Sequence, residues 1–220
     1  MVDAQLLRCA KSVVVFDFET TGLSPNSGDR AIELGAVLIE NGIITDRFQR
    51  LMNPGIRVPV FVENLTGITT SMLKDAAPAQ EVMAEFLQFI DGHNLVAHNA
   101  SFDERFLRAE LKRAKLSAFP PLCCSLLLSR RLLPTAVSHG LSHLAHQFHL
   151  PSTGEYHRAL ADAEVTAHLW LLLCDILKAK YEAPTLPFSF LQEITKTSRH
   201  KLSALIRDRL SSYVSKEYAV

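Results

Sequence analysis

Two carboxylates stand one residue apart near the start of the chain, in the segment VVVFDFETTGL at residues 13–23. Asp17 and Glu19 follow strongly β-forming apolar residues, and residues i and i+2 of a strand project from the same face. Two anions side by side repel one another and lose hydration. The pair is typical of a site that binds divalent cations between its carboxylates. A strand that ends at Phe16 and enters a polar loop is the alternative.

A third acid lies at the start of a predicted helix. In AHNASFDERFL, residues 97–107, Ser101 and Glu104 have the spacing of a capping box, which predicts a helix start near Phe102. Asp103 then lies in the first turn, where a carboxylate also complements the helix dipole. Helix capping is therefore a sufficient explanation of Asp103 taken alone.

A fourth acid faces inward from a long predicted helix. In HRALADAEVTAHLWLLL, residues 157–173, Asp162 lies on the core-directed face of that helix. The other residues of this face are Thr166, Leu169, Leu173 and Ile176. An inward carboxylate needs a cation or hydrogen-bond donors as its partner. His157 lies near the helix start, where a histidine is also common as a surface or capping residue.

Together, these segments resemble the motifs of the DEDDh exonucleases, the family that includes the epsilon subunit of bacterial DNA polymerase III and ribonuclease T. FDFETTGL is similar to the first motif, HNASFDERFL to the second and HRALADAEVTAHL to the third, in the same order over residues 13–175. The resemblance implies a ribonuclease H-like fold and metal-dependent removal of nucleotides from a 3′ end. Arg158 stands where the tyrosine branch of the superfamily has Tyr, which favours the histidine branch.

The resemblance also implies a role for each residue of the set. Asp17, Glu19, Asp103 and Asp162 match the four metal-binding acids of the family. In this scheme Asp17 is the bridge between two ions, and Asp103 positions the second ion. Carboxylate oxygens suit Mg²⁺ or Mn²⁺, and two such ions lie about 4 Å apart in enzymes of this kind. His157 matches the general base, because a free imidazole, with a pKa of about 6.5, accepts a proton from water near neutral pH.

Further residues are candidates for contact with the nucleic acid. The Leu-Thr-Gly-Ile segment within residues 62–73 resembles the strip of the family that lies under the terminal base and sugar. The candidates are Phe18, Thr20, Leu65, Thr66, Ile68, Asn99 and Phe102. Ordinary loop or core packing explains these residues equally well. For the basic residues after Asp103 we favour a solvated face over phosphate contacts; they are Arg105, Arg108, Lys112 and Arg113.

The order of the predicted strands and helices, which must position these residues, indicates an α/β fold in which helices flank a mixed β-sheet. Strands are predicted at residues 13–18, in two runs around Asn41-Gly42, and at 94–98 and 121–125. The Asn-Gly dipeptide indicates a hairpin with a type I′ turn. Helical periodicity is found at 79–90, 102–115, 141–149 and 158–180. A hairpin followed by alternating helices and short strands is typical of a mixed sheet with helices on its faces.

The segment EAPTLPFSF at residues 182–190 predicts a boundary, because its prolines break the preceding helix. We expect an exonuclease domain at 1–180 and a C-terminal helical extension at 181–220. The chain from Lys178 onward carries eight basic and four acidic residues. Its apolar stripe, Leu202, Leu205, Ile206, Leu210 and Tyr213, permits packing on the same domain or a homodimer, and we favour either over contact with phosphates.

Composition excludes several classes of protein. Hydrophobic residues make up 48% of the chain and charged residues 21%, which is typical of a globular protein. Basic and acidic residues number 23 each, so nucleic-acid binding must depend on local patches and metal ions. The four cysteines form no C-x-x-C pair, and their spacing suits neither a zinc site nor a disulfide framework. The apolar block at 169–177 is too short to span a membrane. We expect a cytoplasmic protein without a signal peptide or membrane partner.

These features predict a 3′–5′ exonuclease that releases nucleoside monophosphates from single-stranded or 3′-ended nucleic acid. DNA is favoured, in proofreading or repair-type trimming. The alternatives are an RNA-trimming exoribonuclease of the same family and a non-catalytic nucleic-acid-binding module with this fold. A polymerase or sliding-clamp partner is not predicted, because the C-terminal segment has neither a glutamine-led clamp-binding motif nor a long tethering tail.

Overall fold

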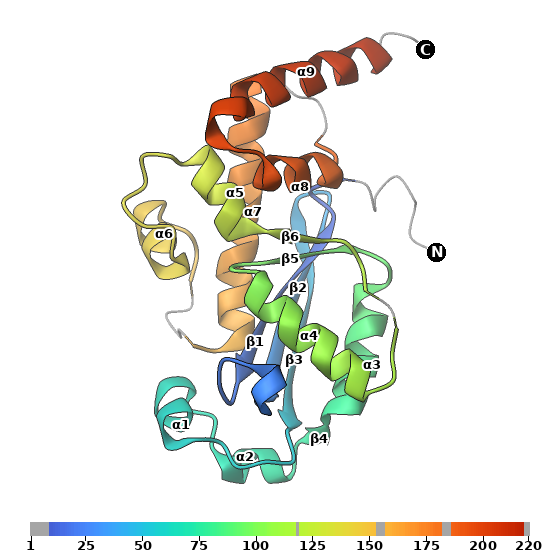
Figure 1. The fold of residues 1–220 in the computed structure, drawn as a ribbon, viewed down its shortest axis with the longest axis vertical. Helices are drawn as coiled ribbons and strands as arrows, with labels where there is room; N and C mark the ends of the chain where they lie inside the picture. The colour runs from blue at the N-terminus through green and yellow to red at the C-terminus, as the bar shows by residue number, and fades with distance from the viewer. Residues whose placement is uncertain (1–8, 118, 153–156, 182–185, 218–220) are drawn as a thin grey trace.

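A six-stranded mixed sheet lies at the centre of the molecule (Figure 1), in a computed structural model that describes residues 9–117, 119–152, 157–181 and 186–217. The strand order is β4-β3-β2-β1-β5-β6. The strands are β1 (Val13–Thr20), β2 (Ala31–Glu40), β3 (Ile43–Asn53), β4 (Ala77–Pro78), β5 (Asn94–Ala97) and β6 (Leu122–Cys124). Strands β1, β2 and β3 are antiparallel, whereas β1, β5 and β6 are parallel, as are β3 and β4. The predicted mixed sheet is confirmed.

The hairpin between β2 and β3 turns at Asn41 and Gly42. Their φ angles are 52° and 83°, both in the left-handed region. A type I′ turn requires positive φ at both central residues, and Asn-Gly meets that requirement at low cost. The turn predicted from this dipeptide is confirmed.

Helices cover both faces of the sheet (Figure 1). One face carries α3 (Ala79–Ile90) and α4 (Ser101–Arg113). The other carries α5 (Ser125–Leu132), α6 (Leu141–Gln147), α7 (Ala159–Tyr181) and α8 (Phe188–Lys196), followed by α9 (Arg199–Glu217). The short helices η2 (Pro25–Ser27), α1 (Val60–Thr66) and α2 (Thr70–Lys74) lie in the connections between strands. Within the described ranges, no helix combines the length and the apolar character that crossing a bilayer requires.

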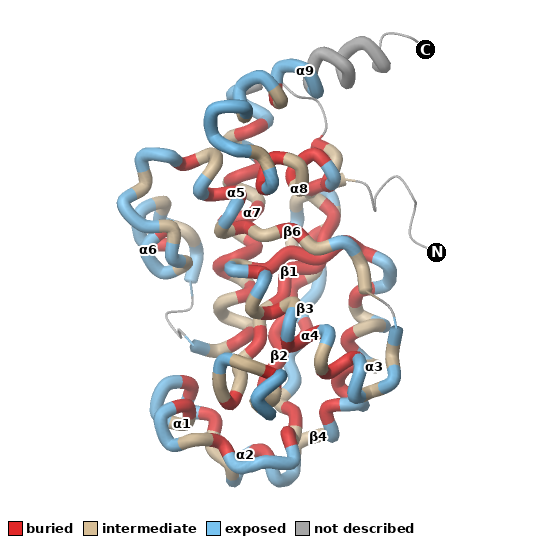
Figure 2. Tube along the Cα trace, viewed as in Figure 1, coloured by how far each residue is buried: buried red, intermediate tan, exposed pale blue. Residues whose placement is uncertain are grey.

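Strand β1 separates two hydrophobic clusters. The side chains of Val14, Phe16 and Phe18 pack with α3 and α4. Those of Val13 and Val15 pack with α7 on the opposite face. Because successive side chains of a strand alternate between faces, one strand contributes to both layers. Figure 2 shows the buried centre of the sheet, in which β5 and the first four residues of β1 are buried.

The start of α4 differs from the prediction. Ala100 is its N-cap residue, and no side chain caps this end, so the capping box predicted for Ser101 and Glu104 is wrong. Asn99 adopts φ 66°, and its carbonyl accepts from the amide of Phe102 at 2.9 Å. The helix therefore begins one residue earlier, at Ser101, and the Glu104 carboxylate accepts from a later arginine instead.

Helix α8 contributes to the hydrophobic cluster of α7. The ring of Phe188 lies 6.0 Å from that of Trp170, and Nε2 of Gln192 donates to the carbonyl of Leu122 in β6. Of the predicted apolar stripe on α9, Leu202, Leu205 and Ile206 pack on the same cluster, whereas the side chains of Leu210 and Tyr213 lie outside the described part. The boundary between 180 and 181 and a homodimer through α9 stay predictions.

Candidate active site

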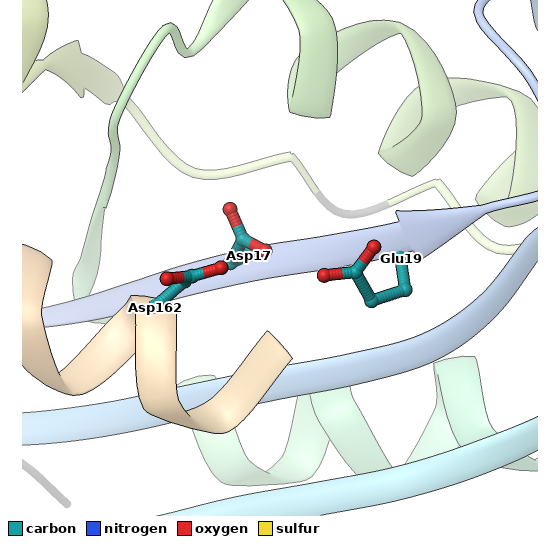
Figure 3. Close-up of side chains that lie close together, drawn as sticks. All are labelled: Asp17, Glu19 and Asp162. Atoms are coloured by element: carbon teal, nitrogen blue, oxygen red, sulfur yellow. The ribbon is translucent and has the colours of Figure 1, made fainter. Parts of the chain in front are cut away.

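Three carboxylates from β1 and α7 converge at one end of the sheet. Asp17 and Glu19 continue the row of odd-numbered β1 side chains that faces α7, and Asp162 lies in the first turn of that helix. Each offers an oxygen, and these oxygens lie within 4.8 Å of one another (Figure 3). Hard divalent cations such as Mg²⁺ and Mn²⁺ prefer carboxylate oxygens, so this donor set fits such an ion.

A glycine allows α7 to lie against the sheet beside these acids. Gly35 of β2 pairs with Asp17 of β1. A Cβ atom added to Gly35 would lie 2.1 Å from the backbone nitrogen of Leu160, which is shorter than any contact between real atoms of these kinds. Only glycine therefore permits this approach, which brings Asp162 into reach of Asp17.

Asp103 reaches the site from the opposite layer. It is 2% exposed, and its Oδ1 accepts from the backbone amide of Phe18 at 3.2 Å. Strand β5 pairs with β1 only at residues 13–15. Beyond residue 15, the backbone groups on this edge of β1 can therefore bond a side chain. Asp103 does not belong to the group of three acids within 4.8 Å, yet its charge contributes to the raised pKa of Asp17.

The pKa values of all four carboxyl groups are raised. Desolvation is the main cause for each, and it raises the pKa of Glu19 and of Asp103 to about 8. Desolvation, with repulsion from Asp103 and Glu19 added, raises the pKa of Asp17 well above its usual value, and the pKa of Asp162 is raised as well. Since each ionised carboxylate disfavours the next, the fully ionised site requires added positive charge.

Glu33 of β2 fastens the start of α7 to the sheet. Its carboxylate, which is fully buried, accepts from the Arg158 guanidinium at 2.8 and 3.2 Å and from the Ala159 amide at 3.0 Å. Nε2 of Gln49 donates to it at 2.8 Å. Glu33 was not predicted from the sequence, although an acid within the apolar run AIELGAV is a signal of a buried charge. Arg158 was predicted only to distinguish the histidine branch from the tyrosine branch of the superfamily.

His157 lies at the entrance to α7. Its backbone amide donates to Oδ2 of Asp162 at 3.2 Å, and its φ is 64°. The side chain is exposed. The backbone thus holds His157 beside a metal-binding candidate, and its role as the general base stays a prediction.

The candidates for substrate contact differ in exposure. Leu65 and Asn99 are exposed, with Leu65 on α1. Thr20 is half-buried and donates through Oγ1 to the carbonyl of Gly22. Phe102 is also half-buried, with the Arg105 guanidinium 5.8 Å from its ring centroid.

The remaining candidates are buried. Phe18 is 4% exposed, and its ring meets that of Phe16 edge-on at 5.8 Å. Thr66 donates through Oγ1 to the carbonyl of Val62 and accepts from the amide of Ile68. Ile68 is fully buried in the cluster beneath α1 and α2. Their proposed contact with substrate stays a prediction, whereas Leu65 presents its side chain on the surface.

The chain is similar to known exonuclease domains over most of its length. The family model described as Exonuclease matches residues 14–170. The 3′-5′ exonuclease DinG of Bacillus subtilis (strain 168) is 38% identical over 196 residues, which cover 87% of this chain and 20% of DinG. A DNA polymerase III PolC-type protein of Caldanaerobacter subterraneus subsp. tengcongensis is 42% identical over 165 residues, 75% of this chain and 12% of that protein. The chain spans a fifth or less of these relatives.

Solved structures share the fold. Exonuclease X, in complex with 5′ overhanging duplex DNA, superposes with a TM-score of 0.64 at 24% identity, over 83% of this chain and 99% of that one. The nuclease domain of 3′hExo, described as a DEDDh family member and bound to rAMP, gives a TM-score of 0.63 at 19% identity, over 75% and 92% of the two chains. The ribonuclease H-like arrangement predicted for the sheet and helices is confirmed.

Proposed function

Because the chain belongs to the DEDDh exonuclease family, we propose that it is a metal-dependent 3′–5′ exonuclease that releases nucleoside 5′-monophosphates from the 3′ end of DNA. The observation that carries the proposal is the convergence of the oxygens of Asp17, Glu19 and Asp162 within 4.8 Å. Four carboxyl groups with raised pKa values around one point have no structural purpose that apolar residues would not serve better.

Asp17, Glu19 and Asp162 would hold two divalent ions, Mg²⁺ or Mn²⁺. When bound, such ions activate a water molecule and stabilise the charge on the reacting phosphate and on the leaving oxygen. Asp103, whose Oδ1 accepts from the amide of Phe18, would position the second ion. The negative charge that raises the pKa values of these groups is thereby compensated.

His157 completes the reaction. A ring nitrogen of its exposed side chain takes a proton from water as the water oxygen attacks the terminal phosphorus. The bond between phosphorus and the 3′ oxygen of the preceding nucleotide then breaks, and that oxygen takes up a proton. Asp162, which accepts from the amide of His157, holds the base next to the acid cluster.

DNA is proposed over RNA because PolC-type DNA polymerases are among the relatives. Metal ions held by these acids would contact phosphate, which DNA and RNA share, so the groove and not the metal site would select the sugar. Trimming of one base sequence as DNA and as RNA separates the two substrates. If ribonucleotides are removed faster, RNA and not DNA is the substrate, and the proposed metal chemistry is unchanged.

The test is Mg²⁺-dependent shortening of a 5′-labelled single strand, with nucleoside 5′-monophosphate identified as the product. Asp17→Asn removes a charge from the centre of the site and should lower kcat/KM at least roughly 100-fold, since metal ions contribute several kcal/mol to stabilisation of the transition state. Asp91→Asn is the matched control, because Asp91 is exposed in the turn after α3 and asparagine tolerates its φ of 40°. Unchanged trimming by Asp17→Asn would refute the assignment.

A further inference from the structure

A hollow of about 410 Å³ lies at the end of α4 that is remote from Asp103. Its apolar lining is Leu111, Leu116 and Phe119, of which Leu111 is buried. Its charged lining is Arg108, Lys112 and Lys115, and none of the described residues that line it is acidic. We call this hollow the α4 pocket.

Three arginines of α4 are committed to contacts within the protein. Nε of Arg105 donates to the carbonyl of Ser101, and Arg113 bonds Glu110 and a backbone carbonyl. Arg108 pairs with Glu104 at 2.8 Å. Its guanidinium also lies 3.6 Å from the centre of a phenylalanine ring, that of Phe119 in the lining of the pocket. A solvated face was favoured for these arginines and for Lys112, and of the four only the side chain of Lys112 lacks such a contact among the described residues.

Lys112 and Lys115 are exposed, and neither side chain has a hydrogen-bond or salt-bridge partner among the described residues. A cation in the last turn of a helix complements its dipole, which is a sufficient role for Lys112. Lys115 lies beyond the last residue of α4, at φ 58°, with its amide bonded to the carbonyl of Lys112. This turn brings the second ammonium group to the same hollow as the first.

We propose that the α4 pocket binds the nucleic-acid strand upstream of the 3′ end that is cleaved, which rests on the proposed exonuclease function. The two ammonium groups suit phosphate oxygens, and the aromatic and aliphatic lining suits the face of a base. Because the chain has no net charge, strand binding depends on such local groups.

The length of α4 sets the distance between this pocket and the acid cluster. Helix α4 runs from the edge of β1 and β5 towards α3 (Figure 1), with Asp103 in its first turn. Lys112 lies nine residues after Asp103, or about 14 Å along the axis. A stacked strand rises about 3.4 Å per nucleotide, so the pocket meets the strand roughly four nucleotides from the cleaved end. A dinucleotide is too short to reach it.

The test is the affinity of Lys112→Gln/Lys115→Gln for a fluorescein-labelled oligothymidylate of more than ten nucleotides, by fluorescence anisotropy over a range of salt concentrations. Both the protein under test and its reference carry Asp17→Asn, so that binding is measured without cleavage. Loss of two phosphate contacts to a single strand should weaken binding roughly tenfold and reduce the slope of log K against log salt by about 1.4. The thermal midpoint should fall by no more than about 3 °C, because both lysines are exposed and Lys112 contributes only its interaction with the helix dipole.

Lys178→Gln/Lys201→Gln is the matched control, since it removes the same charge from exposed positions on α7 and α9. An equal fall in affinity in this control, or no fall in the pocket variant, would overturn the proposal. In the protein with Asp17 intact, the pocket variant should raise KM for the long strand and leave kcat/KM for a dinucleotide unchanged. Failure of the proposed function is distinct: the intact protein would then trim nothing, whereas the anisotropy result would stand by itself.

Discussion

The charges of several neighbouring carboxyl groups act on Asp17. Asp103, Glu19 and Asp162 all raise its pKa, in addition to desolvation. The sequence is enough to predict that the two acids of β1 lie on the same face, because the alternation of side chains within a strand is a local property. The inward direction of Asp162 could be predicted as well, because helical periodicity is local. That the three meet within 4.8 Å depends on how α7 packs against the sheet.

His157→Gln tests the proposed general base. Glutamine retains a polar side chain but cannot take the proton, so kcat should fall roughly 10²–10⁴-fold with little change in KM. Steady-state kinetics on a 5′-labelled strand measures both parameters. His146→Gln, at an exposed position on α6, should leave both unchanged. A fall in kcat matched by an equal rise in KM for the His157 variant would assign the ring to substrate binding instead.

At the scale of elements, the packing of α7 on β2 depends on Gly35. Gly35→Ala places a methyl group against the backbone of Leu160, which a flexible side chain cannot relieve. We expect a loss of roughly 1–3 kcal/mol in the free energy of unfolding, and a loss of trimming, because the first turn of α7 carries Asp162. Urea denaturation and the trimming assay measure the two effects.

Gly140→Ala is the control for that substitution. A Cβ at Gly140 would have only an ordinary contact, 3.7 Å from Oγ of Ser138. Alanine is less favoured than glycine at an N-cap position, so the loss should be about 0.5–1 kcal/mol, which is below that expected at Gly35. Equal stability losses for the two glycine variants would contradict the close approach inferred at Gly35.

The ion pair between Glu33 and Arg158 also holds α7 to β2. Arg158→Met leaves a buried carboxylate without its guanidinium and should cost roughly 2–4 kcal/mol, less than for a fully buried pair because the Arg158 side chain is 33% exposed. The double variant Glu33→Gln/Arg158→Met should be more stable than the two single losses predict, as a double-mutant cycle in urea would measure. Additive single effects would mean that the pair does not act as a unit.

Helices could be predicted from the sequence where their apolar period extends over several turns. The helix predicted at 79–90 coincides with α3, and that predicted at 158–180 differs from α7 by one residue at each end. The helices α1, α2, α5 and α8 were not predicted; they have five to nine residues, which leaves few turns in which to recognise a period, although α6, with seven residues, was predicted. The capping box failed for a different reason: the turn at Asn99 determines where α4 starts.

For the whole molecule, the metal-free protein should lose stability as the pH rises from about 4.5 to about 8. Folding raises the pKa of Glu19 from 4.5, and that of Asp103 from 3.8, to about 8. Over this interval the unfolded chain has released protons that the folded protein retains, so ionisation favours the unfolded state. Thermal midpoints measured in EDTA at pH 5 and at pH 8 test this fall.

Mg²⁺ should reverse the loss, because it binds the ionised carboxylates of the folded protein only. The increase in thermal midpoint on addition of Mg²⁺ should therefore be larger at pH 8 than at pH 5. Glu19→Gln, which removes one of the titrating groups, should reduce both the fall in EDTA and the increase with Mg²⁺. An increase of equal size at the two pH values would contradict metal binding at this cluster.

The sequence by itself determined the properties that depend on neighbours along the chain. These are the shared face of Asp17 and Glu19, the hairpin turn at Asn41-Gly42, and the ordered motifs from which the family was inferred. Strand alternation, turn conformation and helical period are all set within a few residues, so a pattern in the sequence is enough to reveal them.

Only the tertiary structure decided which groups from distant segments satisfy one another. Asp103 accepts from the amide of Phe18 because β5 pairs with β1 only as far as residue 15. Glu33 accepts from the amide of Ala159 at the start of α7 because Gly35 allows that helix to lie close to the sheet. Strand pairing and helix packing are cooperative contacts between distant parts of the chain, and local sequence patterns do not encode the distances between them.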